Sequence, residues 1–144
     1  MSFQENLLDG LGQYLAEHGV GSYPVGNLQP GDTGIYIDRL PAEPDRGVAM
    51  SLYPVDDNTG TTDSVQGVQF RIRGRRGNRR DVKQTSDALF DALHDAVHYE
   101  LGGINIVRSW RQSGTPFPND GNDRQESTVN YYLQLIRTSP HRRD

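Results

Sequence analysis

Two histidines spaced four residues apart are the first residues whose spacing suggests chemistry. His94 and His98 resemble the two ligands of the H-E-x-x-H helix that binds zinc. Asp95 stands where that motif has its glutamate, and a third ligand would have to come from elsewhere. Near the end of a helix, a partly protonated imidazole also favours the helix dipole. We therefore expect a structural role for the pair, with a metal-dependent hydrolase as the alternative.

Other chemical motifs are incomplete. Residues 56–60 and 119–123 are rich in oxygen ligands, but neither has the spacing of a calcium loop, and the same residue types are typical of turns. No serine lies in a G-x-S-x-G elbow, and the glycines of residues 74–77 lack the lysine of a phosphate loop. The absence of cysteine excludes thiol chemistry. We expect no catalytic residue, no cofactor and no metal ion, and therefore not an enzyme.

The charge distribution is strongly uneven. Residues 64–80 contain six arginines and no acid, and because the whole chain carries −4, the remaining residues carry −10. A positive pole on an acidic body indicates a charged partner rather than a fold. Guanidinium groups match phosphates, but the isoelectric point near 5.5 and the lack of a nucleic-acid reading motif argue against specific recognition. Non-specific contact with DNA stays open.

The first half of the chain predicts one helix and three strands. Ser2 and Glu5 have the spacing of a capping box, which would start a helix over residues 3–18. In the third strand, apolar residues alternate with Gln69, Arg71 and Arg73, so these two arginines are expected on a solvated sheet face. The predicted strands cover residues 35–37, 48–53 and 68–73, with a projecting loop over 56–63.

The second half predicts a helix and two further strands. Asp81 and Gln84 resemble a second capping box, which would start a helix with an apolar stripe. We expect Gly102-Gly103 to end this helix. Residues 104–112 and 129–138 are expected to pair as an antiparallel hairpin around a long loop over 114–126. We expect residues 139–144 to form a flexible polar tail.

These elements predict a single α+β domain over residues 1–138. Its expected order is α-β-β-β-α-β-β, with a mainly antiparallel sheet of about five strands and two helices packed on one face. A length of 144 residues suits one domain with a core of its own. No segment has the length and apolarity to span a bilayer, and the N-terminus lacks the pattern of a signal peptide, so no membrane partner is expected.

The chain resembles the small minor capsid and tail terminator proteins of tailed bacteriophages. Besides the order of elements, the likeness lies in four segments: residues 5–8 (ENLL), 34–37 (GIYI), 65–74 (VQGVQFRIRG) and 85–94 (TSDALFDALH). The resemblance implies a structural protein without catalytic residues, of which six copies form a ring that caps the tail tube, stops its growth and joins the tail to the head.

Partners and location follow from the same resemblance. It implies three kinds of partner: further copies of the chain, the tail tube protein, and head–tail connector or neck proteins. It also implies that the protein is in the host cytoplasm during assembly and in the virion afterwards. A head-completion or neck connector protein is one alternative. A small DNA-binding packaging accessory protein is an alternative from another class.

A ring of identical copies requires two different surfaces to meet, and opposite charges on those surfaces set their orientation. We therefore predict that arginines of the positive stretch contact acidic residues on the next copy. The candidate arginines are Arg73, Arg75, Arg76, Arg79 and Arg80, and the candidate acids are Asp56, Asp57, Asp63, Asp120, Asp123 and Glu126. A solvated basic turn is the alternative.

Overall fold

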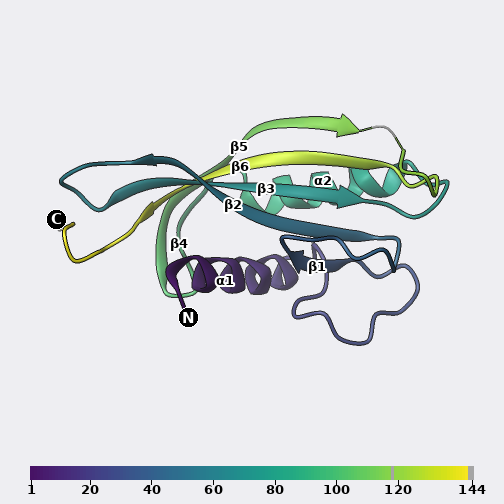
Figure 1. The fold of residues 1–144 in the computed structure, drawn as a ribbon, viewed down its shortest axis with the longest axis horizontal. Helices are drawn as coiled ribbons and strands as arrows, with labels where there is room; N and C mark the ends of the chain where they lie inside the picture. The colour runs from purple at the N-terminus through teal and green to yellow at the C-terminus, as the bar shows by residue number, and fades with distance from the viewer. Residues whose placement is uncertain (118, 143–144) are drawn as a thin grey trace.

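The computed structural model describes residues 1–117 and 119–142, which form two helices and one six-stranded sheet (Figure 1). The strand order across the sheet is β1-β2-β3-β6-β5-β4. The helices are α1 (Phe3–Glu17) and α2 (Arg80–Leu93); the strands are β1 (Gly34–Ile37), β2 (Gly47–Asp57), β3 (Asp63–Arg73), β4 (Ala96–Leu101), β5 (Ile104–Phe117) and β6 (Glu126–Ile136).

The α+β class is confirmed, but the sheet has six strands instead of about five, and one of its pairings is parallel. The sheet is mixed, because β1 pairs with β2 in parallel while the other neighbours pair antiparallel. The connection 38–46 carries the chain back along the sheet before β2 begins. Apolar alternation reports which face of a strand is buried and not its direction, so the sequence pattern did not contain this information.

The sixth strand, β4, replaces what the sequence suggested was the end of the second helix. Helix α2 ends at Leu93, and residues 96–101 pair with β5. Gly102 and Gly103 both have positive φ, 57° and 78°, and connect Leu101 to its partner Ile104 as a two-residue hairpin turn. A Gly-Gly pair serves both as a helix stop and as such a turn. The pairing with β5 decides between the two.

The strands are longer, and the loops shorter, than predicted. Strand β2 continues to Asp57 and β5 to Phe117, so the predicted loops 56–63 and 114–126 shrink to their central residues. Pro54 and Pro116 are tolerated inside these strands because each lies where its strand lacks a neighbour on one side. The pairing of β2 with β3 also shifts register between Pro54 and Asp56, directly after the proline.

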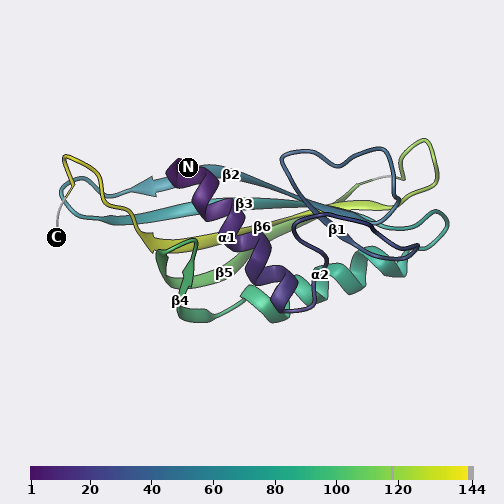
Figure 2. The ribbon, with the colours of Figure 1, turned by 90° about the horizontal axis from the view of Figure 1, so that it is seen from below.

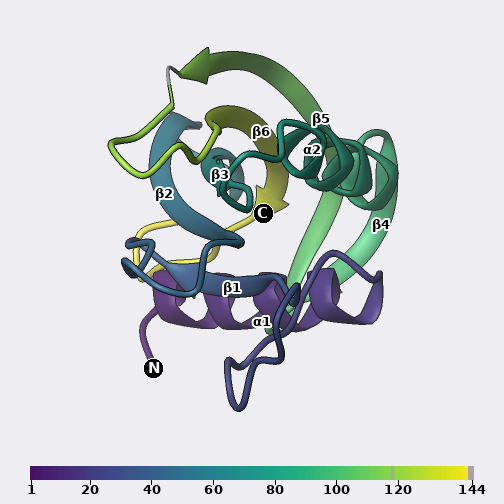
Figure 3. The same ribbon diagram turned by 90° about the vertical axis from the view of Figure 1, so that its right-hand side faces the viewer.

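Helix α1 closes the curl of the sheet. Its predicted capping box is confirmed: the Glu5 amide donates to Ser2 Oγ at 3.2 Å, and the Ser2 amide donates to the Glu5 carboxylate at 3.0 Å. The helix lies across the open side of the curled sheet and contacts both edge strands, β1 and β4 (Figures 2 and 3). The two edges are therefore held by one element.

One apolar core fills the curl. The alternation in β3 is confirmed, since Val68, Phe70 and Ile72 are fully buried. Leu11 of α1 and Leu89 of α2 lie in the same buried cluster, so both helices pack on the apolar face of the sheet. The prediction for the other face of β3 is wrong in one respect, because Arg73 is only 6% exposed.

We predict that Gly10→Ala destabilises the protein although alanine favours helices. A β-carbon at Gly10 would lie 2.1 Å from the amide nitrogen of Gly102, so α1 would have to move off the β4–β5 turn. Overpacking of this kind costs about 2 kcal/mol, which outweighs the gain of about 1 kcal/mol in helix propensity. Urea unfolding measures the difference. Gly26→Ala is the control because no atom lies within 4 Å of its added β-carbon; equal stability of the two variants would contradict the close approach of α1.

Candidate functional site: charged surfaces at the two ends of the sheet

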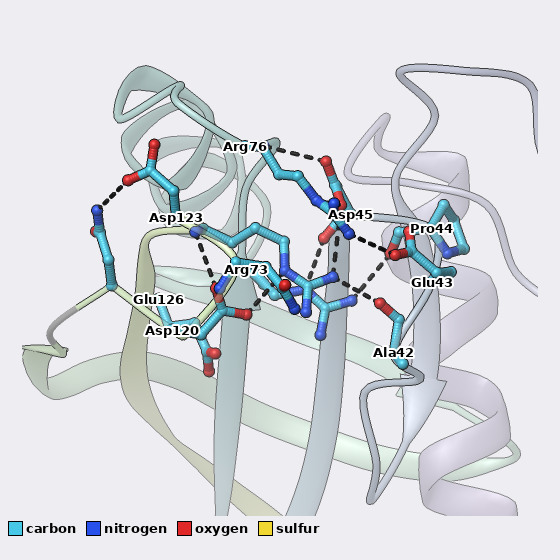
Figure 4. A network of polar contacts seen from close by, with 12 residues as sticks. Ala42, Glu43, Pro44, Asp45, Arg73, Arg76, Asp120, Asp123 and Glu126 are labelled. Carbon is cyan, nitrogen blue, oxygen red and sulfur yellow. Dashed lines mark hydrogen bonds and ion pairs between the residues drawn. The ribbon is translucent and has the colours of Figure 1, made fainter.

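The candidate arginines lie at one end of the sheet, where three loops meet (Figure 4). Arg73, at the end of β3, uses its guanidinium to hold the loop that precedes β2. Its Nε donates to the Asp45 carbonyl at 2.7 Å, and its Nη2 donates to the carbonyls of Pro41 and Pro44 at 2.7 and 2.9 Å. Burial lowers the pKa of Arg73. This arginine therefore serves the fold of its own chain.

Arg76 and Arg124 bind the same loop. Arg76 pairs with Glu43 at 2.6 Å and with Asp45 at 3.2 Å. Arg124, only 5% exposed, pairs with Asp120 at 2.8 Å and donates to the carbonyl of Ala42 at 2.6 Å. Partial burial acts to raise the pKa of Asp45, but hydrogen bonds and charge from Arg76, together with the charge of Arg124, lower it overall. The loop 38–46 is thus fastened to both neighbouring loops.

Arg75 makes a bidentate pair at the start of α2. Its Nε and Nη2 donate to the two oxygens of Asp81 at 2.8 and 3.0 Å, and the Asp81 carboxylate also accepts the Arg75 amide at 2.9 Å. The predicted capping box at Asp81 is therefore wrong. Its carboxylate is taken by Arg75, and the Asn78 side chain accepts the amides of Arg80 and Asp81 instead.

Arg79 and Arg80 are the candidate arginines whose side chains have no partner among the described residues. Within residues 1–117 and 119–142, the side chains of Arg79, Arg80 and Lys83 make no hydrogen bond or ion pair. Arg79 and Lys83 line a groove of about 480 Å³ between α2 and the adjoining ends of β5 and β6. Sequence reasoning missed Lys83; its place four residues after Arg79, in the first turn of α2, was the available signal.

The predicted acids divide between the two ends of the molecule. Asp120 and Glu126 lie at the arginine end, where they pair with Arg124 and Arg71, and Asp123 accepts from Asn119. Asp56, Asp57 and Asp63 lie at the opposite end, around the β2–β3 turn (Figure 1).

The acids of the β2–β3 turn carry charge that the chain leaves largely unused. Asp57 accepts from the Ser64 hydroxyl at 2.7 Å, while the carboxylates of Asp56 and Asp63 have no partner among the described residues. Unpaired acids and unpaired cations thus occupy opposite ends of the sheet.

The segment after β6 docks on this acidic turn. Arg142 donates to the carbonyls of Asn58, Thr61 and Asp63 at 3.2, 2.8 and 2.6 Å. The sequence predicted a flexible polar tail over 139–144, and its polar composition gave no signal for this contact. The last two residues of that tail lie outside the described residues.

The histidine pair does not have the geometry that the metal alternative requires. His94 caps the end of α2 and its Nδ1 accepts the Arg111 amide at 3.1 Å, whereas His98 lies in β4. The expectation that both histidines belong to one helix is therefore wrong. In the part of the chain that the structure describes, no group of three or more His, Asp or Glu side chains is placed to hold a metal ion. None of the described helices is long and apolar enough to cross a membrane.

The fold is shared with solved structures of low sequence identity. A chain in the virion of a native gene transfer agent particle matches with a TM-score of 0.60 and 16% identity, over 94% of this chain and 99% of that one. Another solved chain matches with a TM-score of 0.57 and 12% identity, over 94% and 95%. No curated protein matches the sequence significantly. The class defined by this fold is a small α+β protein with a curled, mixed six-stranded sheet.

A family model then identifies the chain within that class. The model of the bacteriophage tail terminator protein family matches residues 14–137, which is most of the chain. The chain therefore belongs to the bacteriophage tail terminator proteins, and the resemblance predicted from the sequence is confirmed. Membership in this family, with the fold of a virion chain, supports a structural protein of the phage tail or neck that is part of the virion.

We predict that the Arg75–Asp81 pair makes stability depend on acid. The hydrogen bonds from Arg75 lower the pKa of Asp81, whose side chain is only 1% exposed. A lowered pKa in the folded state means that the stabilisation is complete above the ordinary carboxyl pKa, near 4, and is lost as pH falls through the lowered value.

Asp81→Asn tests this sign. We expect a loss of about 2 kcal/mol in the free energy of unfolding at pH 7, since a buried carboxylate bound by arginine is removed. The difference from the unmodified protein should shrink below about pH 4. Urea unfolding at pH 7 and pH 3.5 measures both values. Asp56→Asn, at an exposed acid with no described partner, should change little at either pH; a pH-independent difference for Asp81→Asn would refute the linkage.

Proposed function

We propose that this protein is a tail terminator that acts as a structural subunit and not as an enzyme. Copies associate head to tail in a closed ring, which caps the tail tube, stops its elongation and joins the tail to the head or neck. The observation that carries this proposal is the family match over residues 14–137. The family resemblance implies six copies per ring, with the tube protein and the connector or neck proteins as the other partners.

The charge distribution suits a contact between unlike surfaces of two copies. In a ring, the cationic end of one copy faces a different surface of the next, and unlike charges suit such a contact. Among the described residues, unpaired cations and unpaired acids lie at opposite ends of one chain and fit this arrangement. An antiparallel two-fold dimer would pair the same two ends reciprocally, and the mass in solution separates it from a ring.

Two other functions remain as alternatives. A head-completion or neck connector protein would also be a virion structural protein, assembled in the host cytoplasm and carried in the particle. A small DNA-binding packaging accessory protein would use the unpaired Arg79, Arg80 and Lys83 to contact phosphates. Phosphate contacts give DNA affinity a steep dependence on salt, so a salt series of DNA binding separates this alternative from a protein–protein role.

We predict that the purified protein arrests the growth of tail tubes. Tube subunits of the same phage are allowed to polymerise with and without the protein, and electron microscopy gives the distribution of tube lengths. A terminator should shorten the tubes at a ratio of about one ring per tube end and should be visible at that end. A neck connector would leave tube length unchanged and bind the head vertex instead.

The mass of the protein in solution provides the control. Light scattering should give a closed multiple of the 16.1 kDa chain, six if the family resemblance holds, and the multiple should dissociate as salt rises because opposite charges hold it. A chain that is monomeric at every concentration and also fails to bind or shorten tubes would overturn the proposed function.

A further inference from the structure

We propose that the β2–β3 turn of one copy, residues 56–63, docks in the groove beside α2 of the next copy. This inference rests on the proposed ring and names the two surfaces that build it. The groove is lined from three sides: Arg79 at the N-cap of α2 with Lys83, Ser86 and Asp87 from its first half, Pro116 from β5 and Ser127 from β6. The occupant is a second copy of this chain.

Charge complementarity selects this pair of surfaces. Asp56 and Asp63 on the turn lack side-chain partners within the described chain, and so do Arg79 and Lys83 on the groove. All four are exposed, so their charges are available to a partner. Asp87 also lines the groove, further along α2, and its charge directs the acidic turn toward Arg79 and Lys83 at the start of the helix, where the helix dipole adds positive potential.

The internal ion pairs make three other candidates less suitable. Arg73, Arg75 and Arg76 already bind carbonyls or carboxylates of their own chain. A contact with another copy would have to share these guanidinium groups with the internal partners. Substitution of Arg75 or Arg76 would therefore damage the fold as well as any contact, whereas Arg79 and Lys83 can be changed without breaking an interaction that the described residues show.

The position of the two surfaces excludes a contact within one chain. The turn and the start of α2 lie at opposite ends of the long axis of the molecule (Figure 1). In the proposed ring, each copy offers its turn to one neighbour and its groove to another. Contacts of this head-to-tail kind close into a ring when the rotation between copies allows it.

The free edges of the sheet are unsuited to the rival mode, in which strands of adjacent copies pair. Among the described residues, strand β1 covers β2 only as far as Met50, which leaves residues 51–57 without a strand neighbour on that side. The Met50 carbonyl accepts the Asp38 amide from that side. The backbone N–H and C=O groups of every second residue of a strand face the same side, so those of Leu52 and the ring nitrogen of Pro54 also face the free edge. The proline nitrogen has no hydrogen to donate to another strand.

The part of β5 that β4 does not cover is also poorly suited to pairing with another strand. Strand β4 pairs with β5 only as far as Ser109. Beyond it, a register shift between Arg111 and Ser113 interrupts the strand, and Pro116 supplies no amide donor. Such features prevent edge-to-edge association. Contact between copies is thus left to side chains, as a turn in a groove provides.

The turn is also held in shape before it binds. Arg142 donates to three of its carbonyls, those of Asn58, Thr61 and Asp63, and to the Ser64 hydroxyl at 3.0 Å. A loop ordered in advance loses less conformational entropy when it docks. The acidic side chains are therefore presented on a fixed backbone.

A disulfide experiment tests the contact directly, because the chain contains no cysteine. The full-length double variant Thr59→Cys with Ser86→Cys places one thiol on the turn and one in the groove. After mild oxidation of the assembled protein, denaturing electrophoresis without reductant should show a ladder of covalent oligomers that ends at the copy number of the ring. Reductant should return all bands to the monomer.

Matched variants define what the ladder means. Either single-cysteine variant can form at most a covalent dimer, and an equal mixture of the two should stop at the dimer as well. Thr59→Cys with Gln4→Cys, where Gln4 is an exposed residue of α1, should give no ladder. A ladder of equal intensity from this control pair would mean random collision and would overturn the proposed contact.

Charge reversal provides a second test that does not depend on thiol geometry. Asp56→Lys with Asp63→Lys, and separately Arg79→Glu with Lys83→Glu, should each raise the concentration needed for assembly at least about tenfold, and combining all four changes should restore it. Folding of each variant is checked by urea unfolding.

The possible failures are distinguishable. If the unmodified protein forms rings or caps tubes but the cysteine pair gives no ladder and charge reversal has no effect, the proposed contact is wrong and the proposed function stands. If the acidic turn variant forms normal rings but no longer binds tube ends, the turn contacts the tube and not a second copy, which also overturns the contact. If the unmodified protein neither assembles nor binds tube ends, the proposed function itself is wrong.

Discussion

The fold depends on the contact of α1 with both edges of the sheet. The curled sheet has β1 at one edge and β4 at the other, and α1 touches both, with Gly10 allowing the helix backbone to approach Gly102 in the β4–β5 turn. Without this helix, the concave face and its buried leucines would be open to water. Because the sheet is held in one curvature, the loops at its two ends are presented in fixed positions.

The second constraint is the neutralisation of charge where three loops meet. Arg73, Arg76 and Arg124 fasten the loop 38–46, and a guanidinium that is almost fully buried must find acceptors for its donors. Asp45 and the nearby backbone carbonyls supply them. Together with the Arg71–Glu126 and Arg75–Asp81 pairs, these contacts engage four of the six arginines of residues 64–80. Arg79 and Arg80, with Lys83 close behind them in sequence, have no partner among the described residues and can be offered to another protein.

Sequence periodicity predicted the elements whose residues interact locally. The capping box of α1, the alternation in β3 and the antiparallel pairing of the last two strands depend on residues close in sequence or on a simple repeat, and the structure confirms them. The errors have a common cause. Gly102-Gly103 suits a helix stop or a hairpin, and only the pairing of β4 with β5 separates the two. Likewise, a strand pattern does not state whether its neighbour is parallel, which is why β1 was assigned to a mainly antiparallel sheet.

The sequence by itself determined the class of domain, the family and the presence of opposite charges in excess. It did not determine which charges are available, because that depends on partners distant in the chain: Arg73 binds carbonyls about thirty residues before it, and Arg124 binds a carbonyl 82 residues before it. Arg73 and Arg79 look alike in a list of basic residues. Tertiary structure buries the first among backbone acceptors and leaves the second in water beside a groove, since only folding brings the acceptors within reach.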